Sequence, residues 1–299
     1  MDTISRLAGL LPPEVSEQIW ALADSLCEVR IRAGRPVELR TMNGCGKWTG
    51  PEVVPNTLNR WLAALMDYSL YAREREIGEG FFTLPDGCRV GVCGRAILEG
   101  DRIVGYSAIG SFCVRIARPV EGCAEALMPL LQRDSVASLL IASPPGLGKT
   151  TLLRDTARAL SEAGHHVGMV DERHELAACS QGIPTLNVGP GTDVIDGAPK
   201  ALAILQLVRG MAPTVIVTDE IGGREDADAI LEARRCGVVV IATAHAEDFG
   251  ALFKRSAMHD LLTEGIFNVV ALLGPKPGQI AEVRKLETVR EGDAIWKRA

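Results

Sequence analysis

The second half of the chain alternates two patterns of apolar and polar positions. Five apolar runs have the length of strands buried on both faces, namely Val136–Ala142, His166–Val170, Val215–Thr218, Val238–Thr243 and Phe267–Leu273. Three segments between them have helical spacing, namely Lys149–Ala163, Pro199–Met211 and Glu225–Cys236. Strands that alternate with helices predict an α/β domain built on a parallel sheet with right-handed crossovers.

The first half of the chain mixes helical and strand patterns. Ser16–Cys27 and Thr57–Ile77 have helical spacing, whereas Glu28–Arg40 alternates apolar and basic residues around a turn at Ala33–Gly34, which predicts a hairpin. Four strand-like stretches follow, namely Phe81–Leu84, Cys88–Leu98, Arg102–Ile109 and Phe112–Ala117. The pattern predicts a small α+β domain over residues 1–120. A short helix around Ala124–Gln132 then opens a second domain over residues 121–299.

Composition narrows the class of protein. A chain of 299 residues with 47% hydrophobic and 23% charged residues fits a soluble globular protein of two domains. Its net charge of −6 argues against bulk, nonspecific nucleic-acid binding. We find no signal-peptide pattern and no apolar segment of membrane-spanning length, so we expect a cytoplasmic location. The eight cysteines form no CxxC pair, which predicts reduced structural thiols.

The segment SPPGLGKTT, Ser143–Thr151, lies between a predicted buried strand and a predicted helix, the context that a P-loop requires. Glycines allow the loop to point backbone N–H groups at phosphates, and the helix N-terminus favours an anion there. Lys149 is expected to reach the β- and γ-phosphates of ATP, and the Thr150 hydroxyl to bind Mg²⁺. The predicted nucleotide site comprises Ser143, Pro144, Pro145, Gly146, Leu147, Gly148, Lys149, Thr150 and Thr151. Ser143 replaces the first glycine of the usual motif.

An acidic pair ends the predicted strand at Val215–Thr218. Asp219 is expected to hold Mg²⁺, and Glu220 to orient and activate the attacking water. An acidic pair after a strand is common, so this interpretation depends on the P-loop upstream.

Two further candidates follow strand ends. His245 ends an apolar strand, where a polar side chain faces the ligand crevice of a parallel sheet and can sense the γ-phosphate. A lone histidine there is more often structural, and the position relative to the P-loop reverses that preference. In Met169–Leu176, Glu172 is predicted to lie near the catalytic water or Mg²⁺, although the same pattern fits a solvated charged loop.

The order of these motifs along the chain resembles the secretion ATPase superfamily, which includes motors of type II secretion, type IV pili and type IV secretion. Gly80–Ala96, Gly191–Ala201 and Asp219–Ala233 resemble segments of the stage III sporulation protein AA family. The resemblance covers roughly residues 25–285. It implies a RecA-like P-loop ATPase domain that carries a smaller N-terminal α+β domain.

The resemblance also implies a homo-hexamer, peripheral to a membrane complex, that acts as the mother-cell motor of a channel during endospore formation. Its partners would be membrane-embedded channel proteins, with no nucleic acid expected. The family is expected to have an arginine where this chain has Gly191. An arginine from outside the core usually completes such an ATP site. The candidates here are Arg89, Arg95, Arg115, Arg118, Arg209 and Arg224.

Two other functions remain open on the sequence. An ATP-dependent nucleic-acid remodelling protein could use Glu28–Arg40 as a basic surface, although aromatic content of 4% offers little for base stacking. A nucleotide-gated scaffold without hydrolysis is the third possibility, and the intact Asp219–Glu220 pair argues against it. Fold alone does not decide among these functions.

Overall fold

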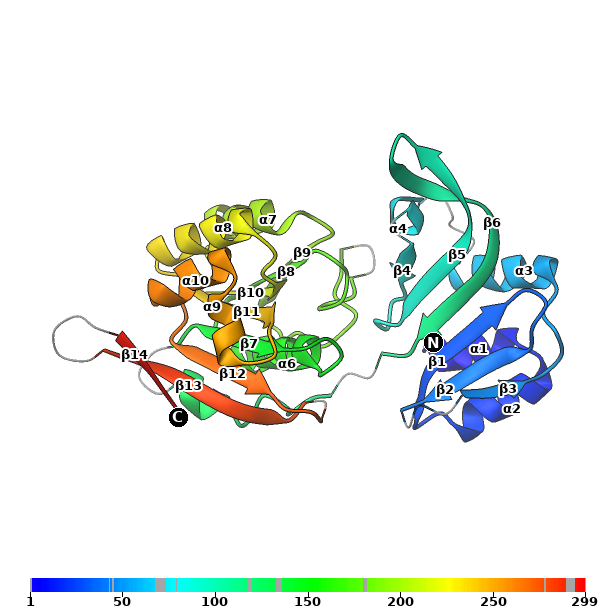
Figure 1. Ribbon diagram of the computed structural model, residues 1–299, viewed down its shortest axis with the longest axis horizontal. Coiled ribbons are helices and arrows are strands. Elements are labelled where there is room, and N and C mark those ends of the chain that lie inside the picture. Colours follow the sequence, from blue (N-terminus) through cyan, green and yellow to red (C-terminus); the bar gives the residue numbers. More distant parts are fainter. Residues whose placement is uncertain are drawn as a thin grey trace. The chain divides into compact units, whose positions relative to one another are not determined.

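The computed structural model describes residues 2–42, 44, 46–67, 74–78, 80–117, 120–132, 136–179, 182–276, 278–288 and 294–298. Contacts along the chain divide it into two compact units, Met1–Arg118 and Pro119–Ala299. Each unit has its own sheet (Figure 1). Each also has its own cluster of buried apolar residues. Within the part of the chain that the structure describes, we find no helix with the length and hydropathy of a membrane span.

The first unit is built on a six-stranded antiparallel sheet of order β3-β2-β1-β6-β5-β4. Its strands are β1 (Leu26–Arg32), β2 (Val37–Thr41), β3 (Gly46–Thr49), β4 (Phe81–Thr83), β5 (Arg89–Glu99) and β6 (Arg102–Arg115). The hairpin predicted over Glu28–Arg40 is confirmed, because β1 pairs with β2. Alternate residues of β1 are buried, as expected for a sheet that is covered on one face.

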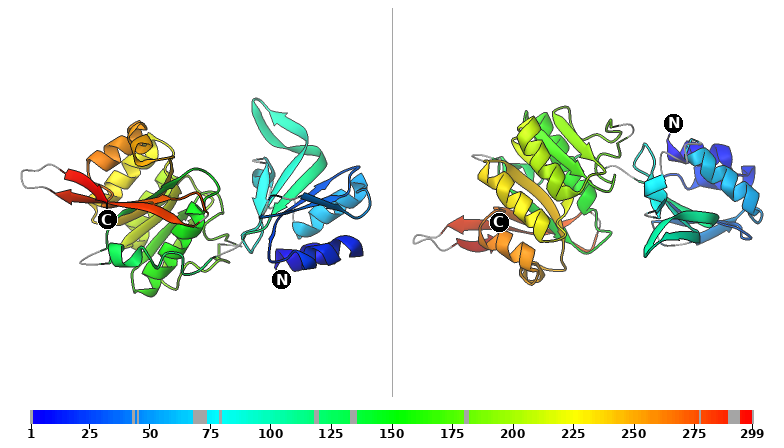
Figure 2. Two further views of the ribbon diagram at one scale, coloured as in Figure 1. Left: turned by 60° about the horizontal axis from the view of Figure 1, so that its bottom comes forward. Right: turned by 90° about the horizontal axis from the view of Figure 1, so that it is seen from above.

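Helices cover that apolar face (Figure 2). They are α1 (Thr3–Leu10), α2 (Pro13–Ala21) and α3 (Pro55–Leu65), and the short α4 (Glu74–Gly78) contacts β4 and β6. Proline occupies the first position of α2 and α3, where a missing backbone N–H costs nothing. Side chains from the helices, such as Ile19 and Leu58, pack with Val29 and Val90 of the sheet.

Three predictions for this unit were wrong in their extents. The helix predicted over Ser16–Cys27 ends at Ala21, because its last residues, from Leu26, are drawn into β1. The helix predicted over Thr57–Ile77 is not continuous: α3 ends at Leu65, and Asp67 has a φ of +52°, which is outside the helical range. Residues 68–73 of this prediction lie outside the described residues, and α4 begins at Glu74. The strands predicted as Arg102–Ile109 and Phe112–Ala117 are a single strand, β6, which pairs along its length with β5.

The second unit has an eight-stranded sheet of order β14-β13-β12-β7-β11-β10-β8-β9. Six neighbouring strands are parallel, namely β7 (Leu139–Ser143), β8 (Val167–Asp171), β9 (Thr192–Asp196), β10 (Val215–Glu220), β11 (Val239–His245) and β12 (Val269–Leu273). All residues of β7, β8 and β12 are buried, which explains their continuous apolar sequences. The parallel α/β fold class is confirmed.

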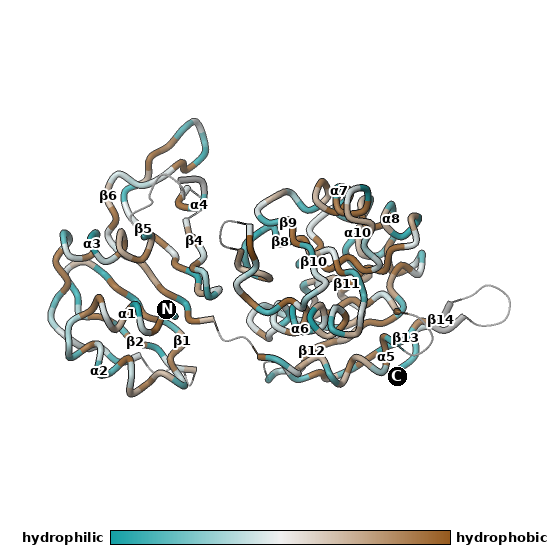
Figure 3. The backbone as a smooth tube through the Cα atoms, turned by 180° about the vertical axis from the view of Figure 1, so that it is seen from behind, coloured by the Kyte–Doolittle hydropathy of each residue, from teal (hydrophilic) through white to brown (hydrophobic). Residues whose placement is uncertain are grey.

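Helices cover both faces of this sheet (Figure 1). On one face, α6 (Lys149–Glu162) packs on residues such as Ile141 and Val217. On the other face, α7 (Lys200–Met211), α8 (Arg224–Arg235) and α10 (Ser256–Thr263) cover residues such as Leu140 and Ile216. Hydrophobic segments accordingly run through the interior around β10 to β12 (Figure 3).

Several elements of this unit differ from the prediction. The sequence pattern missed the edge strand β9, the short helix α9 (Phe249–Phe253) and the helix α10. It also missed the hairpin of β13 (Ile280–Thr288) and β14 (Ala294–Arg298), which extends the sheet in antiparallel fashion beyond β12. The helix predicted around Ala124–Gln132 is reduced to α5 (Met128–Leu131). Edge strands have one exposed side, so their patterns are less apolar than those of central strands.

Gly189 lies against α6 in a backbone conformation that side chains disfavour. Its φ is +91°, and an added Cβ would lie 2.5 Å from Cβ of Ser161 and 2.9 Å from the carbonyl oxygen of Arg158. We predict that Gly189→Ala lowers the free energy of unfolding by more than the roughly 1–2 kcal/mol of left-handed strain alone. Urea denaturation measures the change.

Gly164→Ala is the matched control for this prediction. Gly164 has a φ of +92°, yet an added Cβ would meet no atom within 4 Å. This variant should lose only the strain energy of a left-handed residue. Equal losses in the two variants would contradict a steric role for the contact between Gly189 and α6.

Candidate functional site

The loop from Ser143 to Thr150 connects β7 to α6 at the carboxyl edge of the parallel sheet. Gly146 and Gly148 have φ values of +80° and +87°, which are the conformations that the sequence predicted for glycine here. Gly148 is the N-cap of α6, and a glycine has no side chain that could accept hydrogen bonds from the first N–H groups of the helix. These groups are therefore able to bind an anion.

Lys149 is the first residue of α6, and its side chain folds back over the end of β7. Its Nζ donates to the carbonyl oxygens of Ser143 and Pro144, both at 3.0 Å, and to Oγ of Ser143 at 3.3 Å. It also lies 3.0 Å from Nδ1 of His245. Burial lowers the pKa of the Lys149 ammonium, and the charge of Glu220 opposes that shift.

The strand register brings His245 and Glu220 to the same place. His245 of β11 pairs with Ser143 of β7, and Glu220 of β10 pairs with Thr243 of β11 after a bulge. Nε2 of His245 lies 3.1 Å from Oε2 of Glu220. The three side chains therefore form a continuous series, Lys149–His245–Glu220, across the ends of three adjacent parallel strands.

Asp219 lies in the bulge of β10 and is 8% exposed. Its Oδ1 is 2.9 Å from Nζ of Lys200, at angles that do not make a hydrogen bond. Burial raises the pKa of the Asp219 carboxyl, and the Lys200 ammonium partly offsets that rise.

Lys200 was absent from the predicted site. It is the first residue of α7 and is 4% exposed. A usable signal was present in the sequence, because crossover helices begin at the carboxyl edge of a parallel sheet. A lysine at the first position of such a helix lies beside the strand ends.

The loop after β8 is organised by Asp171, which is completely buried. Its two carboxylate oxygens accept hydrogen bonds from four backbone N–H groups, those of Glu175, Leu176, Ala177 and Ala178. Glu172, by contrast, has a side chain that is 38% exposed and lies 3.6 Å from Nζ of Lys200. The structure therefore separates the two acids of this motif. Asp171 shapes the loop, and Glu172 approaches Asp219 through Lys200.

These groups fit Mg²⁺ that arrives with phosphates. Carboxylate and hydroxyl oxygens are the ligands that Mg²⁺ prefers, and it typically takes one or two protein ligands beside phosphates and water. Among the described residues, no cluster of three or more histidines, cysteines and acids could hold a metal ion without a nucleotide. Asp219 offers a buried carboxylate, and Thr150 follows Lys149 at the start of α6.

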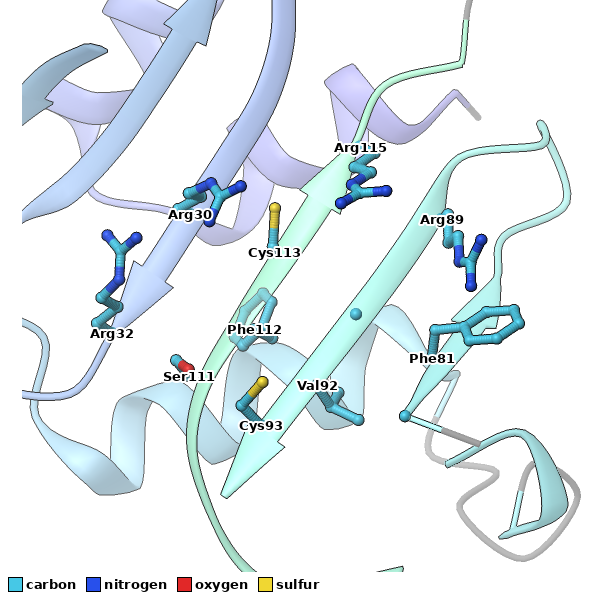
Figure 4. A pocket seen from close by; sticks show the side chains of 12 residues that line it. Arg30, Arg32, Phe81, Arg89, Val92, Cys93, Ser111, Phe112, Cys113 and Arg115 are labelled. Carbon is cyan, nitrogen blue, oxygen red and sulfur yellow. The ribbon is translucent and has the colours of Figure 1, made fainter. Parts of the chain in front are cut away.

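In the first unit, a cavity of about 370 Å³ lies on the exposed face of the sheet (Figure 4). Its floor consists of small residues such as Gly91 and Ser111, and arginines from β1, β5 and β6 border it, namely Arg30, Arg32, Arg89 and Arg115. The guanidinium carbon of Arg89 lies 3.4 Å from the centroid of the Phe81 ring.

The other candidate arginines are placed differently. Arg95 is exposed on β5, and Arg209 is exposed in the last turn of α7. Arg224 pairs with Asp260 at 2.9 Å. Arg118 lies outside the described residues. At Gly191, an added Cβ would lie 3.3 Å from the carbonyl oxygen of His165, so an arginine fits there only with a small shift.

The arrangement is that of an α/β protein with a P-loop at the carboxyl edge of its parallel sheet, and solved structures of similar fold agree. The pilus retraction motor PilT with bound ADP matches with a TM-score of 0.61 and 15% identity, over 95% of this chain and 82% of that chain. The Legionella pneumophila ATPase DotB matches with a TM-score of 0.59 and 14% identity, over 94% of this chain and 78% of that chain. The RecA-like P-loop ATPase fold, preceded by a smaller α+β unit, is therefore confirmed.

Sequence comparison identifies the family. Residues 6–290 match the family described as sporulation stage III, protein AA. Stage III sporulation protein AA of Bacillus subtilis (strain 168) is 40% identical over 277 residues, which are 90% of this chain and 89% of that protein. The chain belongs to the stage III sporulation protein AA family, as the resemblance of its segments predicted.

Proposed function

We propose that this protein is an ATP-hydrolysing motor subunit that powers a secretion-like channel complex during endospore formation. The observation that carries the proposal is the series Lys149–His245–Glu220 at the carboxyl edge of the sheet. It connects the first residue of the helix after the P-loop, through a histidine, to a carboxylate at the next strand end, which supports the roles proposed below. The fold shared with secretion and pilus ATPases supports the proposal, as does membership of a sporulation family.

In the proposed reaction, each side chain has one role. Residues 143–151 hold the phosphates through backbone N–H groups, and Lys149 neutralises the β- and γ-phosphates. Thr150 and Asp219 hold Mg²⁺, which neutralises the charge that develops on the phosphates. Glu220 orients and activates the attacking water. His245 links Glu220 to Lys149, so it can report the presence of the γ-phosphate to the carboxylate. Glu172 is a secondary candidate because it faces Lys200.

We further propose a homo-hexamer that docks, on the mother-cell side, against membrane-embedded channel proteins. Residues 121–299 are its ATPase domain, and residues 1–120 are its N-terminal domain. An arginine of a neighbouring copy completes each ATP site, because a positive charge from outside the core usually stabilises the γ-phosphate in such sites. Arg89 and Arg115 are the preferred candidates, since they border the cavity on the first unit.

A nucleic-acid remodelling activity has less support. On β1, the basic side chains are paired: Arg30 lies 2.8 Å from Glu28, and Arg32 lies 2.7 Å from Glu38. The pairing leaves less positive charge for a phosphate backbone. Turnover measured with and without DNA or RNA decides between the two functions.

Lys149→Ala should lose nucleotide binding, because the phosphates lose the ammonium in the loop. Titration with a fluorescent ATP analogue in the presence of Mg²⁺ measures the change. Lys254→Ala is the control, since Lys254 is an exposed lysine after α9 and should leave the affinity unchanged. Near-native affinity of Lys149→Ala would refute the role of the P-loop.

Glu220→Gln should keep nucleotide binding and lower turnover by about 10²–10⁴-fold, because an amide cannot accept a proton from water. Phosphate release under saturating ATP measures turnover. Glu225→Gln, at an exposed position in the first turn of α8, is the control and should retain the wild-type rate. If Glu220→Gln also turned over at that rate, the catalytic role would pass to Glu172.

Specific activity should rise with protein concentration, because dilution removes the neighbouring copy that completes each site. Closed head-to-tail contacts generate a ring of this kind. The measurement is turnover per subunit from nanomolar to micromolar protein, with light scattering to report the mass. Flat activity from a species that remains monomeric would replace the ring motor by a self-contained ATPase.

A further inference from the structure

Lys200 is surrounded by oxygen atoms from three other elements. Its Nζ donates to the backbone carbonyl oxygen of Glu220 and lies 2.9 Å from Oδ1 of Asp219, both in β10. Oε2 of Glu172, after β8, is 3.6 Å away, and Oδ2 of Asp226, in α8, is 3.9 Å away. The contact with the Glu220 carbonyl is a hydrogen bond, and the contacts with the three carboxylates are ion pairs.

The environment of Lys200 differs from that of Lys149. The Lys149 ammonium lies over the P-loop, among carbonyl oxygens of the loop itself. The Lys200 ammonium instead contacts acids and the backbone of β10. Lys200 is therefore suited to hold the residues that act on the nucleotide and its metal ion, rather than the phosphates.

Charge explains why a cation is needed at this position. Glu172, Asp219 and Asp226 approach one point from three elements, and Asp219 is almost fully buried. Carboxylates this close repel one another, and a buried carboxylate without a partner is strongly disfavoured. The ammonium offsets both effects. Its hydrogen bond to the Glu220 carbonyl also fixes the backbone of Glu220 at the end of β10. The position of the Glu220 side chain depends on that backbone.

We propose that Lys200 is a positioning residue, which orients Asp219 toward Mg²⁺ and fixes the backbone of Glu220 beside the nucleotide. The proposal rests on the proposed ATPase function. Groups that orient a metal ligand typically contribute about 10–100-fold to metal affinity or activity. Lys200 acts through Asp219 and Glu220, so its loss should affect the contribution of Mg²⁺ and the turnover rate more than the binding of the phosphates themselves.

The test compares Lys200→Met with wild type in two assays. Binding of a fluorescent ADP analogue is titrated with and without Mg²⁺. The expected result is that affinity without Mg²⁺ stays near the wild-type value, while the gain in affinity on adding Mg²⁺ falls by about 10–100-fold. In the second assay, kcat should fall by a similar factor. An unchanged Mg²⁺ gain in the variant would overturn the proposal.

Two variants separate positioning from a general loss of structure. Asp226→Asn removes the most distant charge around Lys200 but keeps an oxygen that can accept the 2.8 Å bond from the Gly222 N–H. It should retain the Mg²⁺ gain. The double variant of Lys200→Met with Asp219→Asn should lose no more of that gain than Asp219→Asn alone, because Lys200 acts through Asp219. Additive losses would contradict this route.

The outcomes also separate this inference from the proposed function. If wild type binds no nucleotide, the ATPase proposal fails. If wild type binds Mg²⁺–ADP and Lys200→Met binds it equally well, only the role of Lys200 fails. Should Lys200→Met not fold, Lys200→Arg restores a cation. Because its planar group is larger, Lys200→Arg should fold yet show a reduced Mg²⁺ gain, and a full wild-type gain would contradict fixed positioning by the lysine.

Discussion

Parallel pairing of β7, β11 and β10 determines where the chemistry of the second unit can occur. Each strand ends in a different functional group, namely Ser143 with its P-loop, His245 and the pair Asp219–Glu220. In register, these ends lie side by side at one edge, and the crossover helices α6 and α7 begin at the same edge. Backbone hydrogen bonds between buried strands thus control distances that side chains alone could not maintain.

Two buried lysines, Lys149 and Lys200, lie at this edge and contact different groups. Lys149 is held by carbonyl oxygens of the P-loop, and Lys200 is held among carboxylates beside β10. One ammonium therefore lies over the P-loop and the other lies among the acids, where it offsets their mutual repulsion. The bulge at Asp219 contributes to this separation, since it turns consecutive acids toward different partners. Asp219 faces Lys200, and Glu220 faces His245.

In the first unit, charged side chains lie on one face of an antiparallel sheet instead of at the ends of parallel strands. Alternation along β1 places Val29 and Ile31 in the apolar core and Arg30 and Arg32 on the opposite face. Small residues in β5 and β6 leave a cavity between these arginines and Arg89. Pairing with Glu28 and Glu38 then reduces the charge of that face. The basic appearance of the sequence Glu28–Arg40 therefore overstates the charge that a partner meets.

The P-loop, the central strands and their helices could be predicted from the sequence because their signals are local. A buried strand, two glycines at positive φ and the Lys-Thr pair lie within a dozen residues of one another, and neighbouring residues largely determine their conformation. The sequence also placed His245 and Glu220 at strand ends, but only the tertiary structure decided that His245 contacts both Glu220 and Lys149. The pairing of β9 and of the β13–β14 hairpin depended on it entirely. Lys200 had a signal in the sequence, its place at the start of a crossover helix, but its acidic partners had none. Lys200 meets acids 19 or more residues away, and edge strands obtain their pairing from a sheet whose order no local pattern contains.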